Sequence, residues 1–328
     1  MDLITQANQI YLKNFDKNVW YGRCIFLSWY CDLGTCKFCF RSTIKHKIRH
    51  ASSAKRSLAS MLVEVLLCKK LNWRIEFLTG GYRSHTFNEL LNICKVISKA
   101  YGEKIWINLG TLTDEQLAQL KPYVKGIVAS IETVNPELHD KVCPDKPLAP
   151  YLEMLEKIKD FKKSITIVIG LGETLEDFEL LKELIQKYNL DRITFYALKP
   201  VEGTSFTKGP DTEYYAEWIA RTRIAFPRLQ IIAGTTARRV DEIDIILKAG
   251  ANAITKFPAT KLFNSKQSKI LVEKVAKADR ILTSELNSLP DIDWNQEINS
   301  LNLESELVQD VKKKLDSYLT RMKSNLKE

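Results

Sequence analysis

The chain has 328 residues, 45% of them apolar, and can therefore bury a large core as one big domain or two. No apolar run reaches the length of a membrane span, and the opening MDLITQANQIYLKNF has no apolar signal segment. We therefore expect a cytoplasmic protein, in which clustered cysteines indicate metal or redox chemistry rather than disulfides. The formal net charge of +9 favours an acidic or anionic partner without identifying it.

Short apolar runs alternate with longer amphipathic stretches along most of the chain. Residues 87–101 carry one apolar helical stripe, and Thr113 and Thr174 stand where helix N-caps are expected. Eight runs have the composition of strands buried on both faces: 24–30, 74–80, 105–111, 126–132, 164–171, 192–198, 229–235 and 253–257.

This alternation predicts an α/β fold, a (β/α)₈ TIM-type barrel with an N-terminal extension and C-terminal helices. A doubly wound sheet is the alternative, but eight units in one unbroken series favour closure. We expect residues 1–23 to form the extension, 24–280 the barrel and 281–328 a helical extension. In the last segment an apolar stripe should pack on the outside of the barrel; it comprises Leu307, Val311, Leu315, Leu319 and Met322.

Three of the seven cysteines crowd into the stretch SWYCDLGTCKFCFRSTIKHK, residues 28–47. Cys31, Cys36 and Cys39 follow the first predicted strand and should lie at the C-terminal face of the barrel, where barrel enzymes place their chemistry. Three thiolates can each bind one iron of a cubane cluster and leave the fourth iron open. A structural zinc with His46 as its fourth ligand is the alternative, although such a site has no reason to occupy an active face.

This cysteine motif resembles that of the radical S-adenosylmethionine (SAM) enzymes. The resemblance implies that Cys31, Cys36 and Cys39 bind a [4Fe–4S] cluster and that SAM chelates the fourth iron. One-electron reduction would then release a 5′-deoxyadenosyl radical. The family's usual spacing is three residues and then two, whereas four and then two separate the cysteines here. A loop absorbs one inserted residue easily.

Segments 107–120, 167–181, 198–206 and 247–257 are similar to biotin synthase and come in the same order. The chain therefore resembles the biotin-synthase-like group of radical SAM enzymes. Taken alone, the glycine pair Gly80 and Gly81 would be an ordinary strand-end turn. By position, the resemblance implies SAM contacts from Phe38 and from Gly170 and Leu171 (adenine), Gly80 and Gly81 (amino group), Ser130 and Glu132 (ribose and amino group) and Lys146 (carboxylate).

Biotin synthase holds a second, sulfur-donating cluster on three further cysteines and an arginine. The matching positions lie near Phe77, Trp106 and Ser164, and none of them is cysteine, so we do not expect the chain to be biotin synthase itself. Arg238 or Arg239, after the seventh predicted strand, is the expected replacement for the arginine.

Four other cysteines lie outside the motif. Cys68 and Cys94 fall on helical apolar stripes and should be core, and Cys24, which begins the first predicted strand, should lie far from the cluster. Cys143, with His139 nearby, should lie on the active face. It could ligate a second iron–sulfur cluster or accept a sulfur, and a loop thiol without function is the alternative.

The cysteine spacing and the segment ETVNPELHDKVCPDKPL most resemble the archaeal two-component lipoyl synthases. This resemblance implies sulfur insertion into an octanoyl chain on an acidic carrier protein, with an electron donor and a partner radical SAM subunit. The main alternative is a radical SAM enzyme of another cofactor pathway, of the iron-guanylylpyridinol or hydrogenase-maturase type. A non-enzymatic zinc or nucleic-acid-binding protein is the second alternative.

A basic stretch follows the first cysteine. Residues 33–63 contain no acid, and their cations could form a collar for the carrier protein or simply a solvated loop. The stretch has few aromatic residues to stack bases, which argues against nucleic acid. Its cations are Lys37, Arg41, Lys45, Lys47, Arg49, Lys55 and Arg56.

Overall fold

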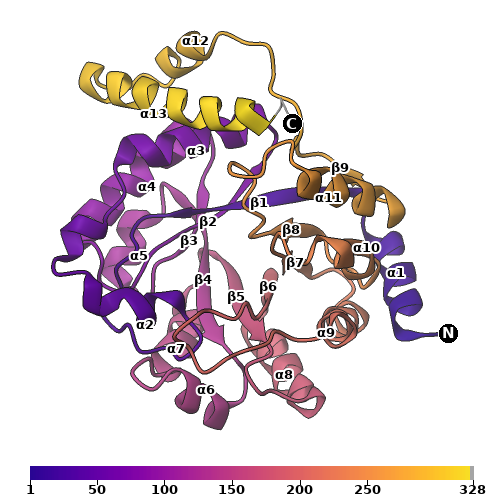
Figure 1. The fold of residues 1–328 in the computed structure, drawn as a ribbon. Coiled ribbons are helices and arrows are strands. Elements are labelled where there is room, and N and C mark those ends of the chain that lie inside the picture. Colours follow the sequence, from indigo (N-terminus) through magenta and orange to yellow (C-terminus); the bar gives the residue numbers. More distant parts are fainter. Residues whose placement is uncertain (326–328) are drawn as a thin grey trace.

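The computed structural model describes residues 1–325, which form a closed barrel of parallel strands inside a ring of helices (Figure 1). Strands β2 to β8 follow one another in chain order, and β1 closes the barrel by pairing with both β2 and β8. The predicted TIM-type barrel is therefore confirmed. The strands are β1 (Asn18–Phe26), β2 (Arg74–Thr79), β3 (Ile105–Asn108), β4 (Val124–Glu132), β5 (Lys162–Ile169), β6 (Arg192–Ala197), β7 (Gln230–Gly234), β8 (Ala253–Thr255) and a short outer β9 (Ile281–Leu282).

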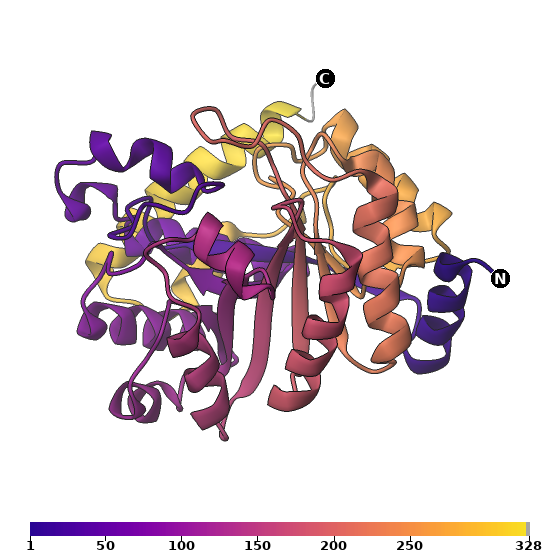
Figure 2. The ribbon, with the colours of Figure 1, turned by 90° about the horizontal axis from the view of Figure 1, so that it is seen from below.

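At least one helix follows each barrel strand, and Figure 2 shows the strands side by side within the helical ring. No helix of residues 1–325 has the length and apolar character required to cross a bilayer. The helices are α1 (Leu3–Asn14), α2 (Phe40–Ile44), α3 (Leu58–Lys70), α4 (Phe87–Tyr101), α5 (Asp114–Leu120), α6 (Pro136–Val142), α7 (Ala149–Lys157), α8 (Phe178–Tyr188), α9 (Thr212–Ala225), α10 (Ile243–Lys248), α11 (Lys266–Lys277), α12 (Trp294–Asn299) and α13 (Ser305–Ser324).

Local sequence explains where these helices begin. Helix α4 coincides with the predicted stripe at 87–101, and Thr113 caps α5 by accepting a hydrogen bond from the backbone of Gln116. Thr174 forms the same reciprocal capping box with Asp177 at the turn that leads into α8. Both predicted caps are confirmed.

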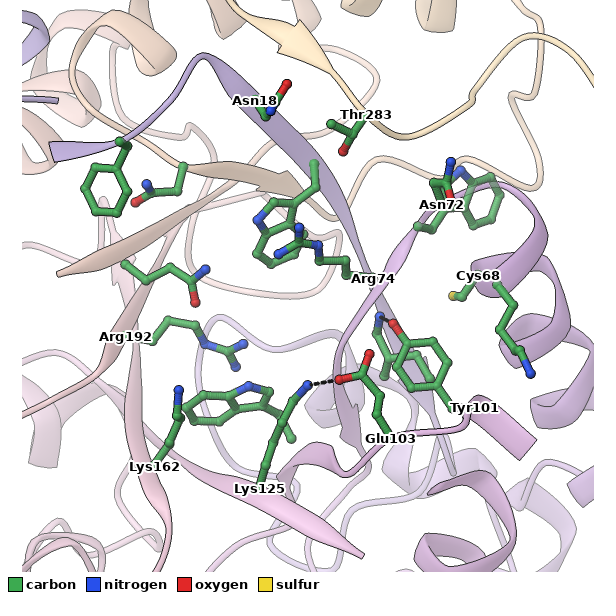
Figure 3. Close-up of a pocket in the computed structure, with 18 of the residues that line it drawn as sticks. Asn18, Cys68, Asn72, Arg74, Tyr101, Glu103, Lys125, Lys162, Arg192 and Thr283 are labelled. Carbon is green, nitrogen blue, oxygen red and sulfur yellow. Dashed lines mark hydrogen bonds and ion pairs between the residues drawn. The ribbon is translucent and has the colours of Figure 1, made fainter. Parts of the chain in front are cut away.

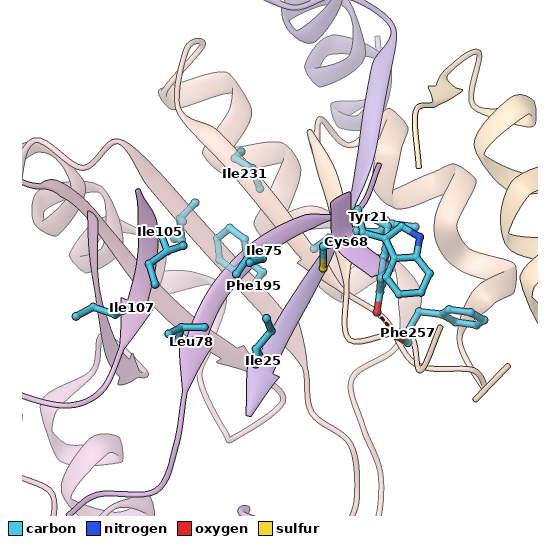
Figure 4. Packing of buried hydrophobic residues seen from close by; sticks show 14 of the residues in the cluster. Tyr21, Ile25, Cys68, Ile75, Leu78, Ile105, Ile107, Phe195, Ile231 and Phe257 are labelled. Carbon is cyan, nitrogen blue, oxygen red and sulfur yellow. Dashed lines mark hydrogen bonds between the residues drawn. The ribbon is translucent and has the colours of Figure 1, made fainter. Parts of the chain in front are cut away.

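Strand side chains alternate between two apolar regions. One set, which includes Ile25, Ile75 and Leu78, packs between the strands and the surrounding helices (Figure 4). The other set points into the barrel, where residues of α6 and of the loops after β5 and β6 join it, and we call the whole group the lumen cluster. Its buried members are Cys24, Phe77, Trp106, Val128, Val142, Cys143, Val168, Leu171, Tyr196 and Leu198, and the partly buried Phe26, Cys36, Phe38, Leu138 and Phe206 pack against them.

The first strand begins six residues earlier than predicted, at Asn18 instead of residue 24. Arg23 interrupts the apolar run, but it forms an ion pair within the protein, because its Nε donates to Glu64 Oε2 at 2.8 Å. Residues 18–23 are therefore barrel and not extension. The strand also ends earlier, at Phe26, so four further residues separate it from Cys31.

Helix α13 covers α3 on the outside of the barrel (Figure 1). The predicted stripe supplies the contact, since Val311, Leu315, Leu319 and Met322 are buried and Leu307 is partly buried. Helix α13 is thus part of the folded unit. Residues 281–282 also join it, because β9 pairs with the start of β1.

Candidate active site

The cysteine loop lies at the C-terminal end of the barrel and is docked on the end of β2. The Tyr82 amide donates to Cys31 Sγ at 3.4 Å, and the Asp32 amide donates to the Tyr82 carbonyl at 2.9 Å. Gly81 permits this contact, because a Cβ there would overlap the Tyr30 carbonyl oxygen. A cradle of this kind, with an amide directed at sulfur, suits a cysteine that binds the iron of a cluster.

The other two thiols of the motif sit on the turn that leads into α2. The Cys39 amide donates to the Cys36 carbonyl at 3.1 Å, and the three motif cysteines are partly exposed and unpaired. No three His, Cys, Asp or Glu side chains of residues 1–325 form a cage for a single metal ion. Each thiolate of a cubane ligand set binds a different iron, so the three thiols of the loop need not converge on one point. The donor set and its cradle fit a [4Fe–4S] cluster.

Cys143 lies against the cysteine motif, at the C-terminal end of α6. The Cys143 thiol donates a hydrogen bond that lowers the pKa of Cys36, with Lys146 adding to the effect, and the same contact raises the pKa of Cys143. The contact therefore favours loss of the proton from Cys36 over loss from Cys143. The neighbouring His139 ring is fully buried, and neither of its nitrogens has a hydrogen-bond partner, although Nδ1 lies 3.8 Å from Asp140 Oδ1.

Charged and hydroxyl side chains gather at the end of β4, as the family resemblance implies for SAM. Lys146 Nζ pairs with Glu132 Oε1 at 2.7 Å and also donates to the Ser130 carbonyl. Ser130 Oγ donates to Asn108 Oδ1 at 2.9 Å. Burial opposes the Lys146 charge, but the Glu132 carboxylate outweighs it and raises the pKa of Lys146. Glu132 has a left-handed φ of 62°, a strained conformation typical of functional sites.

The segment after β5 folds around its own carboxylate. Glu173 accepts from the amides of Gly170 at 2.6 Å and Leu171 at 2.8 Å, and Gly170 has a φ of 106°. Burial raises the pKa of Glu173 in spite of these bonds. Leu171 belongs to the lumen cluster, with which Phe38 is also packed. The structure thus brings the residues expected at the adenine to the wall that carries Cys36.

The two arginines expected in the barrel interior lie elsewhere. Arg239 pairs with Glu242, Nη2 to Oε2 at 2.6 Å, and donates to the Pro210 carbonyl at 2.7 Å, while Arg238 is exposed. The guanidinium found in the barrel is that of Arg192, which is 2% exposed and lies 3.9 Å from the centroid of the Trp106 ring.

A buried carboxylate, Glu76, occupies the middle of the barrel. It accepts from Thr194 Oγ1 at 3.1 Å, Tyr196 Oη at 3.2 Å and Cys24 Sγ at 2.9 Å, and also from Thr255. Cys24 therefore points into the lumen, and its expected place far from the active end was wrong because β1 begins earlier. Burial, followed by the Glu76 charge, raises the pKa of Cys24.

The positions that match the second cluster of biotin synthase are filled with packed side chains. Trp106 lies under Arg192, and Ser164 Oγ accepts from Arg192 Nε at 3.3 Å. Phe77 is 2% exposed within the lumen cluster. The interior is thus built around Glu76 and Arg192, which sequence reasoning missed. The only signals were Glu76 within the mostly apolar segment RIEFLTG and Arg192 at the start of RITFYAL.

Comparisons with known proteins identify the family of the chain. Residues 27–185 match the Radical SAM superfamily, and residues 194–283 match the Biotin and Thiamin Synthesis associated domain. An uncharacterised protein of Methanocaldococcus jannaschii is 32% identical over 98% of this chain and 94% of its own length. Biotin synthase of Coxiella burnetii is 28% identical over 64% of this chain and 68% of its own length.

Solved structures share the fold. The FeFe-hydrogenase maturase HydG from Carboxydothermus hydrogenoformans is similar with a TM-score of 0.70 and 18% identity, covering 95% of this chain and 81% of that one. Methylornithine synthase (PylB) is similar with a TM-score of 0.66 and 20% identity, covering 77% and 76%. The superfamily uses a [4Fe–4S] cluster and SAM, and Cys31, Cys36 and Cys39 are the residues that fit the cluster. The chain belongs to the radical SAM superfamily, carries a Biotin and Thiamin Synthesis associated domain and has biotin synthases among its homologues.

Proposed function

We propose that the chain is a lipoyl-synthase-like sulfurtransferase that inserts sulfur into an unactivated C–H bond of an octanoyl chain on a carrier protein. The lumen cluster is the observation that carries this proposal. Cys36 and Phe38 pack against it, and its buried members include Leu171, Val168 and Val128. An apolar wall next to the [4Fe–4S] cluster suits an alkyl chain, since each CH₂ removed from water contributes about 0.8 kcal/mol to the binding free energy.

The residues of the active site divide into three tasks. Cys31, Cys36 and Cys39 would hold the cluster, and the Glu132–Lys146 ion pair would meet the amino and carboxylate groups of SAM. When bound, these cofactors supply the 5′-deoxyadenosyl radical that takes a hydrogen atom from the substrate. The apolar side chains of the lumen cluster then exclude water from the substrate carbon.

We propose that a partner protein supplies the sulfur atom. The barrel offers Phe77, Trp106 and Ser164 where biotin synthase binds its sulfur-donating cluster, and these side chains are packed. Cys143 contacts Cys36 and is better placed to tune the cluster cysteine than to give up its own sulfur. A second subunit that completes the reaction matches the resemblance to two-component lipoyl synthases.

The docking surface for an acidic carrier is smaller than the basic stretch suggested. Four of its seven cations are engaged within the protein. For example, Lys55 pairs with Glu89 at 2.6 Å and Arg56 with Glu64 at 2.8 Å. Lys37, Lys47 and Arg49 remain exposed beside the cysteine loop. These three side chains are the proposed contact for the carrier.

The test is to incubate the anaerobically reconstituted enzyme with an octanoylated carrier domain, reductant and SAM, with and without a candidate partner protein that carries sulfur. We expect a mass gain of one or two sulfur atoms on the acyl chain only when the partner is present. Formation of 5′-deoxyadenosine while the acyl chain stays unchanged under all conditions would refute lipoyl chemistry and favour another cofactor pathway.

A further inference from the structure

The opposite end of the barrel, at the start of the strands, is hollowed. A cavity of about 940 Å³ opens there (Figure 3). The first residues of five strands line it: Asn18, Arg74, Lys162, Arg192 and Gln230. The first residues of parallel strands share one end of a barrel, so this basal cavity faces away from the cysteine loop. Neither the cluster nor SAM accounts for it.

Arg192 lies at the inner wall of the basal cavity. Its Nε donates to Ser164 Oγ at 3.3 Å and its Nη2 to the Glu76 carbonyl at 3.2 Å, and both acceptors are uncharged. Within residues 1–325 it forms no ion pair, although it is only 2% exposed. Burial lowers the pKa of Arg192 to about 10, so the guanidinium stays charged at neutral pH. The Glu76 carboxylate favours the charged guanidinium from a distance but forms no ion pair with it, so an anion in the cavity would add the direct charged partner that Arg192 lacks.

A second guanidinium at the cavity also lies over an indole ring. Arg74 lies 5.1 Å from the ring centroid of Trp20, as Arg192 lies over Trp106, so an indole orients each planar cation. Stacking leaves the edges of a guanidinium free to bind carboxylate or phosphate with two parallel hydrogen bonds.

The charge around the cavity is unbalanced. Five cations and two acids line it, and six cations and two acids line an adjacent hollow of about 630 Å³, with Lys125 and Lys162 in both. Nine different cations therefore face four acids. Two of the acids pair with two of the cations: Glu103 with Lys125 at 2.5 Å and Asp160 with Lys121 at 2.8 Å. The other two acids, Asp16 and Asp191, accept from the backbone amides of Asn18 and Lys163. Much of the net charge of +9 is thus concentrated at this end.

We infer that the basal cavity is a binding site for a small organic anion that carries phosphate or carboxylate groups. A small ligand fits better than the surface of an acidic protein, because the Arg192 charge is recessed and the cavity has the volume of small-molecule sites, about 300–1,000 Å³. Two ends of one barrel would then serve different ligands, SAM at the cysteine loop and an anion at the base.

The experiment is calorimetric titration of the cluster-loaded protein with pyrophosphate and, separately, with citrate, at constant ionic strength. We expect saturable one-to-one binding of at least one of them. Arg192→Gln should weaken it at least tenfold and Lys162→Gln about threefold. Lys95→Gln, which removes an exposed cation of α4 that does not line the cavity, should leave it unchanged.

Circular dichroism and the iron content of each variant separate lost binding from lost folding. If Arg192→Gln does not fold, the double variant Arg74→Gln/Lys162→Gln replaces it, with the same tenfold loss expected. Absence of binding at millimolar probe would overturn the inference. Equal weakening by Lys95→Gln would also overturn it in favour of diffuse surface charge, and binding of polyglutamate but of neither small anion would overturn it in favour of an acidic protein partner.

Discussion

Gly81 is the residue at which strand β2 comes closest to the cysteine loop. A Cβ at this position would overlap the Tyr30 carbonyl, whereas a Cβ on Gly80 would meet Ser84 Oγ at 3.3 Å. Gly81→Ala should therefore displace Cys31 from the Tyr82 amide and reduce the iron bound after reconstitution severalfold. Gly80→Ala, the matched control, should retain its iron. Equal iron content in the two variants would show that the loop tolerates the methyl group.

Other residues of the site differ in how far the sequence predicted them. Ser130, Glu132 and Lys146 were predicted from the family resemblance, and they meet because a strand end and the loop beyond it share one face of the barrel. Glu76 and Arg192 were not predicted, since a charged residue in a mostly apolar strand is equally compatible with an exposed position. Only the closed barrel shows that four donors surround the Glu76 carboxylate.

At the scale of elements, Glu64 of α3 joins three parts of the chain. Its carboxylate accepts from Arg23 of β1 at 2.8 Å, from Arg56 at 2.8 Å and from Tyr318 of α13 at 3.2 Å. The contact explains why β1 can include a charged residue and begin earlier than its apolar pattern predicts. Helix boundaries were better predicted than this strand boundary, because caps such as Thr113 are local signals whereas the Arg23–Glu64 pair is a tertiary contact.

Replacing this carboxylate should destabilise the fold. Glu64→Gln leaves two partly buried guanidinium groups without a counter-ion, and we expect a loss of about 3 kcal/mol at pH 7. Burial opposes ionisation of Glu64, but Arg23 and Arg56 outweigh it and lower its pKa. The stabilisation is therefore present above the unfolded-state pKa of about 4.3 and is lost as pH falls through the lower folded-state value.

Urea unfolding of the cluster-free protein at pH 7 and at successively lower pH measures this dependence. The difference between wild type and Glu64→Gln should shrink below about pH 4. Glu306→Gln, at an exposed position of α13, should stay within about 0.5 kcal/mol of wild type throughout. A loss that is the same at every pH would mean that packing, not charge, makes Glu64 important.

On the scale of the whole molecule, the two ends of the barrel differ in chemistry. One end carries thiols, the Glu132–Lys146 pair and an apolar wall, and the other carries a surplus of cations. The sequence predicted the barrel because its eight short apolar runs alternate with helical stretches and so form eight strand–helix units. It could not predict the basal cavity, because the residues that line it are scattered from Tyr11 to Thr283 and only closure of the barrel brings them together.

The central claim is that Cys31, Cys36 and Cys39 bind a [4Fe–4S] cluster, and anaerobic reconstitution with iron and sulfide tests this claim most directly. Iron analysis and electron paramagnetic resonance of the reduced protein, with and without SAM, should give about four irons per chain and a spectrum that changes when SAM is added. Cys36→Ser should lose both properties while the barrel stays folded. A folded, iron-free wild-type chain that instead binds one zinc ion through Cys31, Cys36 and Cys39 would contradict the assignment.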